Sequence, residues 1–452
     1  MQNYLPVTPT HLIHLIIQLR ARVRAPLFLA AHRRRPADFT RERKLPFLVV
    51  LLLILQKTTK SVQRHLHEFL AQWFAQGDTP AVTPGGWTQA RAKLQHTAFL
   101  ELDQQVLLPH FYAPEQAAQR RTWRGHRALG VDGSEARLPQ SEELATHFGE
   151  VKVTNQHGAT GTSYPAAAFS VLYDLLNHVG LDARLEPHTR GEVEVALEQV
   201  VGLQSGDVLI WDRGFTGFRL MAAVRARGAH FIGRCSRASF LAAQELFRLD
   251  RAGRSVVTKV YAPADERAEL QRLGLPTELL VRFVSVRLST GELEVLVTSL
   301  LDEAAYPTEE FLDVYHWRWG HETYHQRLKG RLDLENWSGE TVEAVRQDFF
   351  AAVLLANLET LLQGPAQAHL TQVSGARRHK AQVNRANSYH ALKTRLVELL
   401  ASDEPVEEVL RRLQQWLVGS PVAVRPGRKV PRRPVSMHRS YHYQRHVRKS
   451  VY

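Results

Sequence analysis

The chain has 452 residues, of which 44% are hydrophobic and 23% charged, as is typical of a globular protein with roughly two to four domains. Lysine and arginine outnumber aspartate and glutamate by 58 to 45, and the net charge of +13 favours a polyanionic partner such as nucleic acid, although a basic protein without such a partner has the same balance. Cys235 is the only cysteine, which excludes an internal disulfide framework and a cysteine-based zinc site and fits a reducing cytoplasm.

Residues 1–120 are predicted to be helical. Apolar residues recur with helical spacing over 11–23, they fill 47–55, and a further helical pattern runs from Trp87 to about Phe111. The run 47–55 has nine residues, about half the length of a membrane span, and no basic region precedes an apolar one at the N-terminus. We therefore expect neither a transmembrane segment nor a signal peptide.

This helical region is strongly basic. Between Met1 and Lys44 there are nine Arg or Lys residues and two acids, and residues 33–35 are consecutive arginines. A basic helical domain is suited to reading DNA, because a helix can enter the major groove while nearby cations bind phosphates. A solvated charged face is the alternative for any single arginine. The prediction is a helical N-terminal DNA-binding domain over 1–120.

A different pattern begins at Trp123. Short apolar segments are predicted to be strands, and amphipathic segments between them to be helices. In chain order these are a strand within 127–138 that ends at Asp132-Gly133, strands at 166–176 and 180–188, a helix at 191–203, a strand within 207–215 that ends at Asp212, a helix at 216–228 and a strand at 229–236. This order suits an α/β fold with one mixed sheet flanked by helices, and it is the order of the RNase H-like fold.

The remaining chain is predicted to complete this core in two steps. A β-rich insertion with a hairpin is followed by one helix around Glu322 and by a second, strongly apolar helix. The last segment holds nine Arg or Lys residues, four prolines and no acid, and is predicted to be a nucleic-acid-binding arm or a solubilising tail. The predicted parts after residue 120 are the first part of the core at 121–236, the insertion at 237–306, the second part of the core with C-terminal helices at 307–420, and the basic tail at 421–452.

Four polar residues share one face of the helix around Glu322. Tyr315, Arg318, Glu322 and Lys329 have the spacing Y-x2-R-x3-E-x6-K, which places them on an arc of about 60° if the helix is regular. Apolar residues fall on the opposite side and can face a core. An exposed face with an intrahelical Arg318–Glu322 pair is one interpretation. A carboxylate flanked by cations and a phenol also suits a metal ion and a phosphodiester.

Two aspartates have comparable positions in the predicted sheet. Asp132 and Asp212 each end an apolar strand, and each begins a glycine-bearing turn. An aspartate at a strand end is often a turn cap. Adjacent strand ends in one sheet can also bring two carboxylates together, and Glu322 on a packed helix can supply a third. Three carboxylates can hold two Mg²⁺ ions for an in-line phosphoryl displacement.

These residues resemble a known family. Asp132, Asp212 and the run from Tyr315 to Lys329 are similar to DDE transposases of the insertion-sequence-four type, which are named for their YREK signature. The resemblance covers roughly residues 120–365. It implies an RNase H-like core in which Asp132, Asp212 and Glu322 are the catalytic metal ligands, with two Mg²⁺ ions that Mn²⁺ can replace. It also implies that Tyr315, Arg318 and Lys329 bind DNA phosphates near the transposon end.

By the same resemblance, the enzyme is expected to nick double-stranded DNA with water as the nucleophile. The freed 3′-hydroxyl then forms a hairpin on the opposite strand, the hairpin is opened, and the 3′ ends join target DNA. A synaptic homodimer on two transposon ends is implied, without a membrane partner. The expected location is the cytoplasm of a prokaryote, associated with the nucleoid when DNA is bound.

The chain departs from the family at one point, and other functions stay open. Better-known members stack a flipped base on a tryptophan of the β-insertion, but no tryptophan lies between Asp212 and Tyr315, which leaves Tyr261 or Phe283 for that role. The histidines near Glu322, at positions 316, 321 and 325, are interpreted as surface or DNA-facing residues rather than ligands. The alternative functions are a metal-dependent nuclease that cuts without joining, and a DNA-binding repressor without catalysis.

Overall fold

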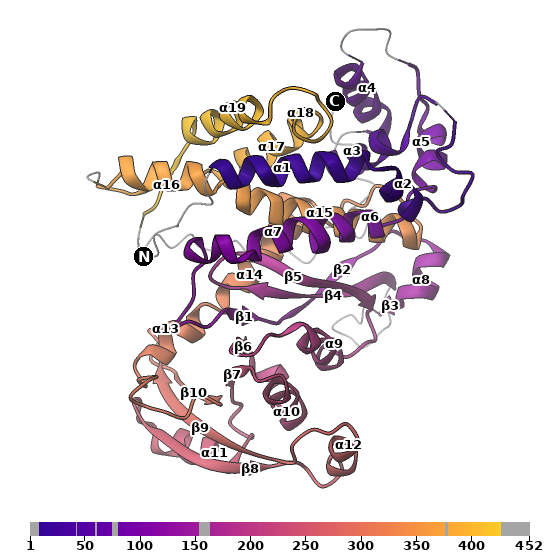
Figure 1. The fold of residues 1–452 in the computed structure, drawn as a ribbon. Coiled ribbons are helices and arrows are strands. Elements are labelled where there is room, and N and C mark those ends of the chain that lie inside the picture. Colours follow the sequence, from indigo (N-terminus) through magenta and orange to yellow (C-terminus); the bar gives the residue numbers. More distant parts are fainter. Residues whose placement is uncertain are drawn as a thin grey trace. The chain divides into compact units, whose positions relative to one another are not determined.

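The computed structural model describes residues 9–41, 43–58, 61–74, 80–152, 163–375 and 378–425 (Figure 1). The chain forms two compact units. The first unit comprises Met1–Arg120, Ala136–Ala167 and Arg327–Tyr452, and the second comprises Arg121–Glu135 and Ala168–Gln326. The helical region 1–120 thus belongs to the same unit as the C-terminal helices. The five-part division of the chain stays a prediction, and most of the tail, 426–452, lies outside the described residues.

The second unit contains the predicted mixed sheet. The sheet begins with the order β2-β4-β1-β6-β7, where β2 is Gly133–Arg137, and β5 pairs with β4 off this path. Strands β4 and β1 are antiparallel, while β1, β6 and β7 are parallel. The strands are β1 (Ala128–Gly130), β4 (Tyr164–Asp174), β5 (Val179–Pro187), β6 (Val208–Trp211) and β7 (His230–Arg234). Helices α9 (Glu192–Gln199) and α10 (Phe218–Ala226) separate the last three strands along the chain. The α/β class and the RNase H-like order of elements are confirmed.

The central strands are short, apolar and buried. Every residue of β1 and β6 is buried, as expected for parallel strands that are covered on both faces. The buried side chains of α9 and α10, among them Ala196 and Met221, belong to the same hydrophobic cluster as Leu129 and Leu209 of these strands. The sheet is therefore a rigid platform for the loops that follow β1 and β6.

The predicted insertion extends this sheet. Its strands continue the order as β7-β10-β9-β8, with antiparallel pairing throughout. They are β8 (Ser255–Tyr261), β9 (Glu278–Arg287) and β10 (Leu293–Thr298), and the added helices are α11 (Leu241–Leu249) and α12 (Arg267–Arg272). The turn between β9 and β10 contains Gly291 at φ +89°, a backbone conformation that glycine adopts without strain. The three predicted strands are present, whereas the two helices of this segment were not predicted.

The helix around Glu322 is not one regular α-helix. It consists of α13 (Glu310–His316), α14 (Trp319–Gln326) and a π-helical turn, η5 (Arg327–Arg331). At the first junction the backbone N–H groups of Trp317, Arg318 and Gly320 bond to carbonyls three residues earlier, which tightens the turn. The π-helical turn then widens the helix. The assumption of 100° per residue, on which the shared arc of Tyr315 and Lys329 depended, is therefore wrong for this segment.

The first unit is mainly helical. Its N-terminal helices are α1 (Pro9–Arg24), α2 (Pro26–His32), α3 (Phe47–Gln56), α4 (Val62–Trp73), α5 (Pro84–Arg91), α6 (Thr97–Glu101), the π-helical η1 (Leu102–Leu107), α7 (Leu108–Tyr112) and the 3-10 helix η2 (Pro114–Gln119). Its later helices are α8 (Glu142–Phe148), α15 (Val342–Leu362), α16 (Gly364–Val373), α17 (Arg385–Thr394), α18 (Leu396–Leu400) and α19 (Val406–Gly419). Its short strands are β3 (Glu150–Val151), β11 (Ala381–Gln382) and β12 (Val422–Ala423). Strand β2 (Gly133–Arg137) begins in the second unit and ends in the first. The second unit also contains the 3-10 turns η3 (Val200–Gly202) and η4 (Arg213–Phe215).

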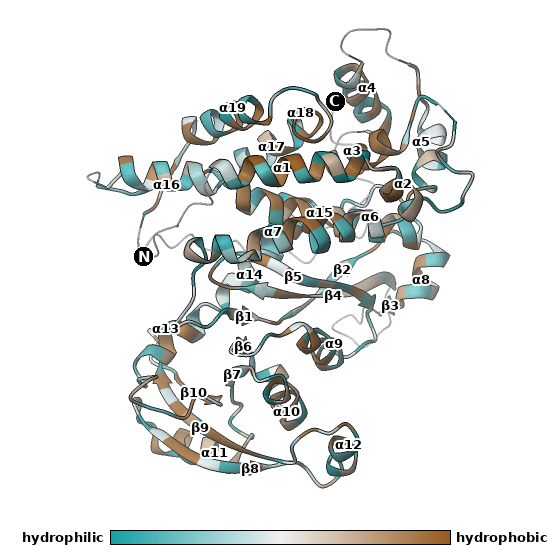
Figure 2. Ribbon diagram, in the orientation of Figure 1, coloured by the Kyte–Doolittle hydropathy of each residue, from teal (hydrophilic) through white to brown (hydrophobic). Residues whose placement is uncertain are grey.

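Helix α15 is the core of the first unit. Its neighbours include α3, α6 and α16, and α3 is almost entirely hydrophobic (Figure 2). By length and composition alone the segment Val342–Val373 is long and apolar enough to cross a membrane. However, 94% of its most apolar 18-residue stretch is buried inside the protein, as is typical of a core helix. Segments from both ends of the chain therefore share one hydrophobic core.

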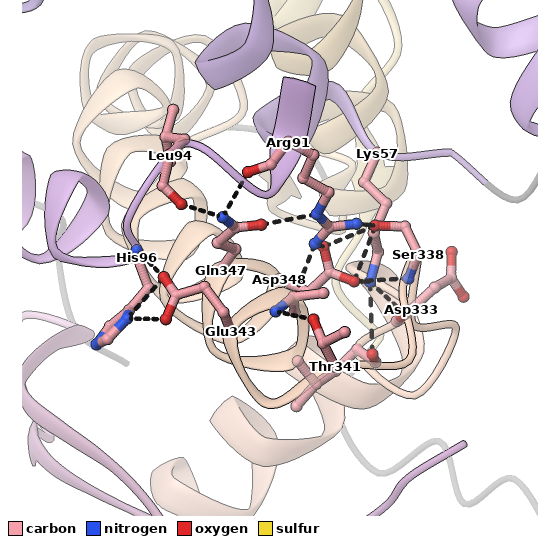
Figure 3. A network of polar contacts seen from close by, with 12 residues as sticks. Lys57, Arg91, Leu94, His96, Asp333, Ser338, Thr341, Glu343, Gln347 and Asp348 are labelled. Atoms are coloured by element: carbon pink, nitrogen blue, oxygen red, sulfur yellow. Dashed lines mark hydrogen bonds and ion pairs between the residues drawn. The ribbon is translucent and has the colours of Figure 1, made fainter. Parts of the chain in front are cut away.

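A buried polar network joins α5 to α15 within this core (Figure 3). Arg91 of α5 donates to Asp348 Oδ1 at 2.8 Å, to the carbonyl of Ala344 at 2.7 Å and to Gln347 Oε1 at 2.7 Å. The backbone N–H of Ser338 donates to Asp348 Oδ2 at 2.7 Å. Burial alone would raise the pKa of Asp348, but the Arg91 and Lys57 charges and the Ser338 bonds keep that pKa below its ordinary value. Asp348 is therefore a buried, ionised side chain that links α5 to α15.

Removing Arg91 should destabilise the first unit. In Arg91→Ala, Asp348 keeps its burial but loses its closest cation, and breaking a buried ion pair typically costs about 3–5 kcal/mol. Arg64→Ala is the matched control, because Arg64 forms an exposed pair with Glu68 and such pairs contribute about 0.3–0.5 kcal/mol. Urea unfolding of both variants measures the difference. Equal midpoints for Arg91→Ala and the wild type would contradict this account.

Asp103 should make stability fall with rising pH. Burial raises its pKa to about 7, although Asn357 and Gln104 donate hydrogen bonds to it. The folded state then holds a proton that the unfolded state releases above its ordinary pKa of 3.8, so the stabilisation is complete below that value and is lost as pH rises through about 7. In Asp103→Asn this loss should disappear, which makes the variant more stable than the wild type at pH 8 by a few kcal/mol, on the order of one per pKa unit. Unfolding free energies at pH 5 and pH 8 test this, and an equal pH dependence in both proteins would refute it.

Candidate active site

Asp132 and Asp212 follow two neighbouring parallel strands. Asp132 comes two residues after β1, and Asp212 comes directly after β6. Gly130 of β1 pairs with Ile210 of β6, and the pairing continues with the N–H of Val131, which donates to the Ile210 carbonyl at 3.4 Å. Because parallel strands end at the same edge of a sheet, both aspartates leave the sheet at one edge. Each of the two side chains is partly buried.

Helix α14 carries Glu322 and is docked closely on the sheet. The His321 Nε2–H donates to the carbonyl of Val171 on β4 at 2.6 Å. Two glycines allow this approach: a Cβ at Gly130 would lie 3.3 Å from His321 Cδ2, and a Cβ at Gly180 would lie 2.9 Å from the Tyr324 hydroxyl. A larger residue at Gly180 would collide with Tyr324 of the helix, whereas one at Gly130 would collide first with Leu175 Cδ2, at 2.9 Å, and would also crowd His321. The glycines thus set the distance between the helix and the strands.

Arg318 connects the three predicted carboxylates. Its side chain is 8% exposed, and it donates to Glu322 Oε1 at 3.1 Å. Its charge also lowers the pKa of both Asp132 and Asp212, and the Glu322 charge acts on Asp132. The structure therefore brings Asp132, Asp212 and Glu322 into electrostatic range of one buried guanidinium. Among the described residues, the carboxylate oxygens of these three side chains do not all lie within 4.8 Å of one another.

Asp212 is held by several donors. The Tyr315 hydroxyl donates to Asp212 Oδ1 at 3.2 Å, Arg234 Nη1 lies 3.4 Å from the same atom, and the backbone N–H of Arg213 donates at 2.7 Å. Burial alone would raise the pKa of Asp212, but the Arg213 N–H bond and the Arg318 and Arg234 charges keep it below its ordinary value. Arg234 is itself fixed by a paired contact with Glu294. Asp212 is therefore ionised and oriented before any ligand arrives.

Asp132 has a different environment. Burial raises its pKa to about 6, the Arg318 charge opposes this shift, and the nearby Glu192 and Glu322 charges add to it. A carboxylate that is poorly solvated and lies near other acids gains most from a nearby cation. The two aspartates thus share a sheet edge but differ in the solvation of the carboxyl group.

His321 and His325 are buried, so their interpretation as surface or DNA-facing residues is wrong. Their exposed fractions are 0% and 7%. One ring nitrogen of each, together with a carboxylate oxygen of Asp132, forms a group in which all ligand atoms lie within 4.8 Å of one another. The spacing of four residues on a helix could have indicated a shared face. That this face lies on β4 could not be predicted from helical spacing, because the contact is between segments 150 residues apart.

This donor set fits divalent metal ions. Three carboxylates lie around a single buried cation, and carboxylate oxygens are the ligands that hard ions such as Mg²⁺ prefer. The Asp132 carboxyl is poorly compensated, as its raised pKa shows. Asp132, Asp212 and Glu322 are thus the residues that would hold such ions.

The other signature residues have contrasting surroundings. Tyr315 and Arg318 are 5% and 7% exposed and face Asp212 and Glu322. Lys329 is partly exposed, lies on η5 and belongs to the first unit. Of the two aromatic residues considered for base stacking, Phe283 is fully buried in the hydrophobic core, whereas Tyr261 at the end of β8 is 58% exposed.

Comparisons with known proteins show the family of the chain. The family model described as "Transposase DDE domain" matches residues 123–358, which include both aspartates and Glu322. The chain belongs to the DDE transposase family. It is 24% identical over 327 residues to the transposase InsG for insertion sequence element IS4 of Escherichia coli K12, an alignment that covers 70% of each chain. It is 22% identical over 108 residues to the putative transposase InsZ of the same organism, covering 24% of this chain and 35% of that protein.

A solved structure is also similar. The piggyBac transposase in a synaptic complex with hairpin DNA is 9% identical, with a TM-score of 0.44, and the match covers 92% of this chain and 86% of that one. The resemblance of this DDE transposase to the insertion-sequence-four type, seen first in its sequence, is confirmed by the family model and by the IS4 relative. As a member of the family it is an enzyme that cleaves DNA and depends on divalent metal ions.

Replacing Arg318 should destabilise the metal-free transposase. In Arg318→Met the aliphatic part of the side chain is kept, but Glu322 loses its hydrogen bond and three carboxylates lose a common cation, at a cost on the order of 2 kcal/mol. Mg²⁺ should then raise the melting temperature of the variant more than that of the wild type. Thermal unfolding in EDTA and in Mg²⁺ measures this. The same Mg²⁺ response in both proteins would show that Arg318 does not balance the carboxylates.

Proposed function

We propose that this chain is the transposase of a DNA insertion sequence and performs cut-and-paste transposition. Its reaction is Mg²⁺-dependent cleavage at the ends of the element, followed by transfer of the 3′ ends to target DNA. The observation that supports this most directly is the grouping of Asp132, Asp212 and Glu322 around Arg318. The partners are transposon ends and target DNA, with a homodimer as the working assembly.

Each acidic residue has a distinct part in the proposed reaction. Bound to these carboxylates, Mg²⁺ ions supply Lewis-acid stabilisation of the attacking and leaving oxygens. Asp212 presents a carboxylate whose direction is fixed by Tyr315 and Arg234. Asp132 presents a less solvated carboxylate, and Glu322 arrives on the docked helix α14. Carboxylates held in fixed positions would not need to reorganise during phosphoryl transfer.

We also propose that Tyr315, Arg318 and Lys329 bind DNA phosphates. Guanidinium and ammonium groups suit this task because phosphate contacts position a strand without reading its sequence. In the described state Arg318 is paired with Glu322 and Tyr315 with Asp212. Both side chains could bind a phosphate in place of these partners, with the carboxylates then free to hold divalent ions. Lys329, which lies on η5, contributes a positive charge for a DNA phosphate.

Replacing any of the three acids should abolish cleavage and preserve DNA binding. Asp132→Asn, Asp212→Asn and Glu322→Gln each remove a metal ligand but leave the basic surface, so we expect a loss of nicking of at least about a thousandfold. Asp313→Asn is the matched control, because Asp313 lies exposed on α13. Nicking of a duplex that carries an element end is measured beside a mobility-shift assay.

The same assay separates the alternatives. Wild-type nicking by Glu322→Gln would contradict the assignment of the triad. Cleavage by the wild type without joining to a target plasmid would favour a nuclease over a transposase. Binding to element ends without any Mg²⁺-dependent or Mn²⁺-dependent cleavage by the wild type would favour a repressor.

A further inference from the structure

One carboxylate and two histidines meet beside the triad. A carboxylate oxygen of Asp132 and one ring nitrogen each of His321 and His325 all lie within 4.8 Å of one another. Both histidines are nearly or fully buried, and Asp132 is partly buried. The group is enclosed within the second unit, so bulk water solvates it poorly. Buried imidazoles grouped with a carboxylate need either mutual hydrogen bonds or a cation.

The two imidazole rings are held in place by the fold. They lie on one face of α14 at positions i and i+4, with ring centroids 4.6 Å apart and planes at 89°. Phe169 packs edge-on against His325 at 5.0 Å, and Tyr173 packs edge-on against His321 at 5.5 Å. Both aromatic residues come from β4. Both rings are therefore packed between α14 and β4.

His321 has the hydrogen-bond pattern of a metal ligand. Its Nε2–H donates to the Val171 carbonyl at 2.6 Å, which fixes the tautomer that has a lone pair on Nδ1. That Nδ1 atom is buried and has no hydrogen-bond partner. Histidines that bind metals usually donate their other ring N–H to a backbone carbonyl or a carboxylate, which orients the ring and increases its basicity. His321 already has this support from β4.

We propose that Asp132, His321 and His325 bind a first-row transition-metal ion such as Mn²⁺, Co²⁺ or Zn²⁺. The ligand set is one carboxylate oxygen and two imidazole nitrogens, with the remaining positions left for water or substrate oxygens. Imidazole ligands suit these ions, whereas Mg²⁺ prefers oxygen ligands. This proposal adds a metal-binding site to the proposed function, and the role of the bound ion in DNA cleavage rests on that function. Asp132 then belongs both to this site and to the carboxylate triad.

The competing explanation is that the histidines only position Asp132. A neutral imidazole could donate a hydrogen bond to the carboxylate and fix its direction, with no ion bound to nitrogen. Both explanations predict lower activity when His325 is replaced. Activity therefore does not separate them, and a direct signal of nitrogen coordination does.

Co²⁺ provides such a signal. The full-length, metal-free protein is titrated with Co²⁺, and the visible d–d absorption is followed. We expect a bound ion with nitrogen ligation in the wild type and affinity lowered at least about tenfold in His325→Ala and in His321→Gln. His316→Ala is the matched control, since His316 lies exposed on the preceding helix α13, and it should bind as the wild type does. Melting curves of each variant verify the fold, and His325→Ala, at the less buried position, carries the test if His321→Gln unfolds.

A second measurement identifies the ligands. Pulsed electron paramagnetic resonance of bound Mn²⁺ should show ¹⁴N coupling in the wild type that is weaker or lost in His325→Ala. A Co²⁺ spectrum and affinity unchanged in His325→Ala, or Mn²⁺ without ¹⁴N coupling in the wild type, would overturn the proposal in favour of positioning. The Glu322→Gln variant separates the test of this metal site from the test of the proposed function. It should lose nicking while it retains the nitrogen-coupled ion, and loss of that coupling in Glu322→Gln would also count against the proposed ligand set.

Discussion

The close docking of α14 on the sheet is the constraint on which the active site depends. Gly130 and Gly180 leave room for His321 and Tyr324, and the hydrogen bond from His321 to the Val171 carbonyl fixes the helix against β4. Glu322 follows His321 in the chain, so its distance from the aspartates is set by this contact. Because phosphoryl transfer tolerates little misplacement of the reacting groups, the proposed catalysis would depend on these small residues although they touch no substrate.

Electrostatics explain why a guanidinium lies at the centre of an acidic site. Three carboxylates at one sheet edge repel one another, and burial of Asp132 makes its ionised form more costly still. Arg318 offsets this repulsion through one hydrogen bond and two longer-range interactions. The protein can therefore fold with the site assembled before any cation arrives. The same logic recurs in the first unit, where Arg91 and Lys57 keep the buried Asp348 ionised.

The sequence predicted the strands well because each is a short apolar run ended by a turn signal, and parallel pairing then placed Asp132 and Asp212 at one edge. It failed where backbone geometry departs from the regular helix. The tightened turn at Trp317 and the π-helical turn after Gln326 change the directions of the side chains that follow them. Neither turn was predicted from the residue pattern. Burial of His321 and His325 was missed for another reason. It depends on a contact with β4, which periodicity within one helix cannot reveal.

The local charge of the site opposes the charge of the whole protein. The chain carries a net charge of +13, which favours approach of DNA over long distances. At the proposed reaction centre, however, Asp132, Asp212 and Glu322 are acidic, and Arg318 is already engaged by Glu322. Long-range attraction alone thus brings DNA to the protein but does not seat the scissile phosphate. In the proposed reaction, divalent ions held by the three carboxylates would offset this local negative charge, and the site would then favour a phosphate.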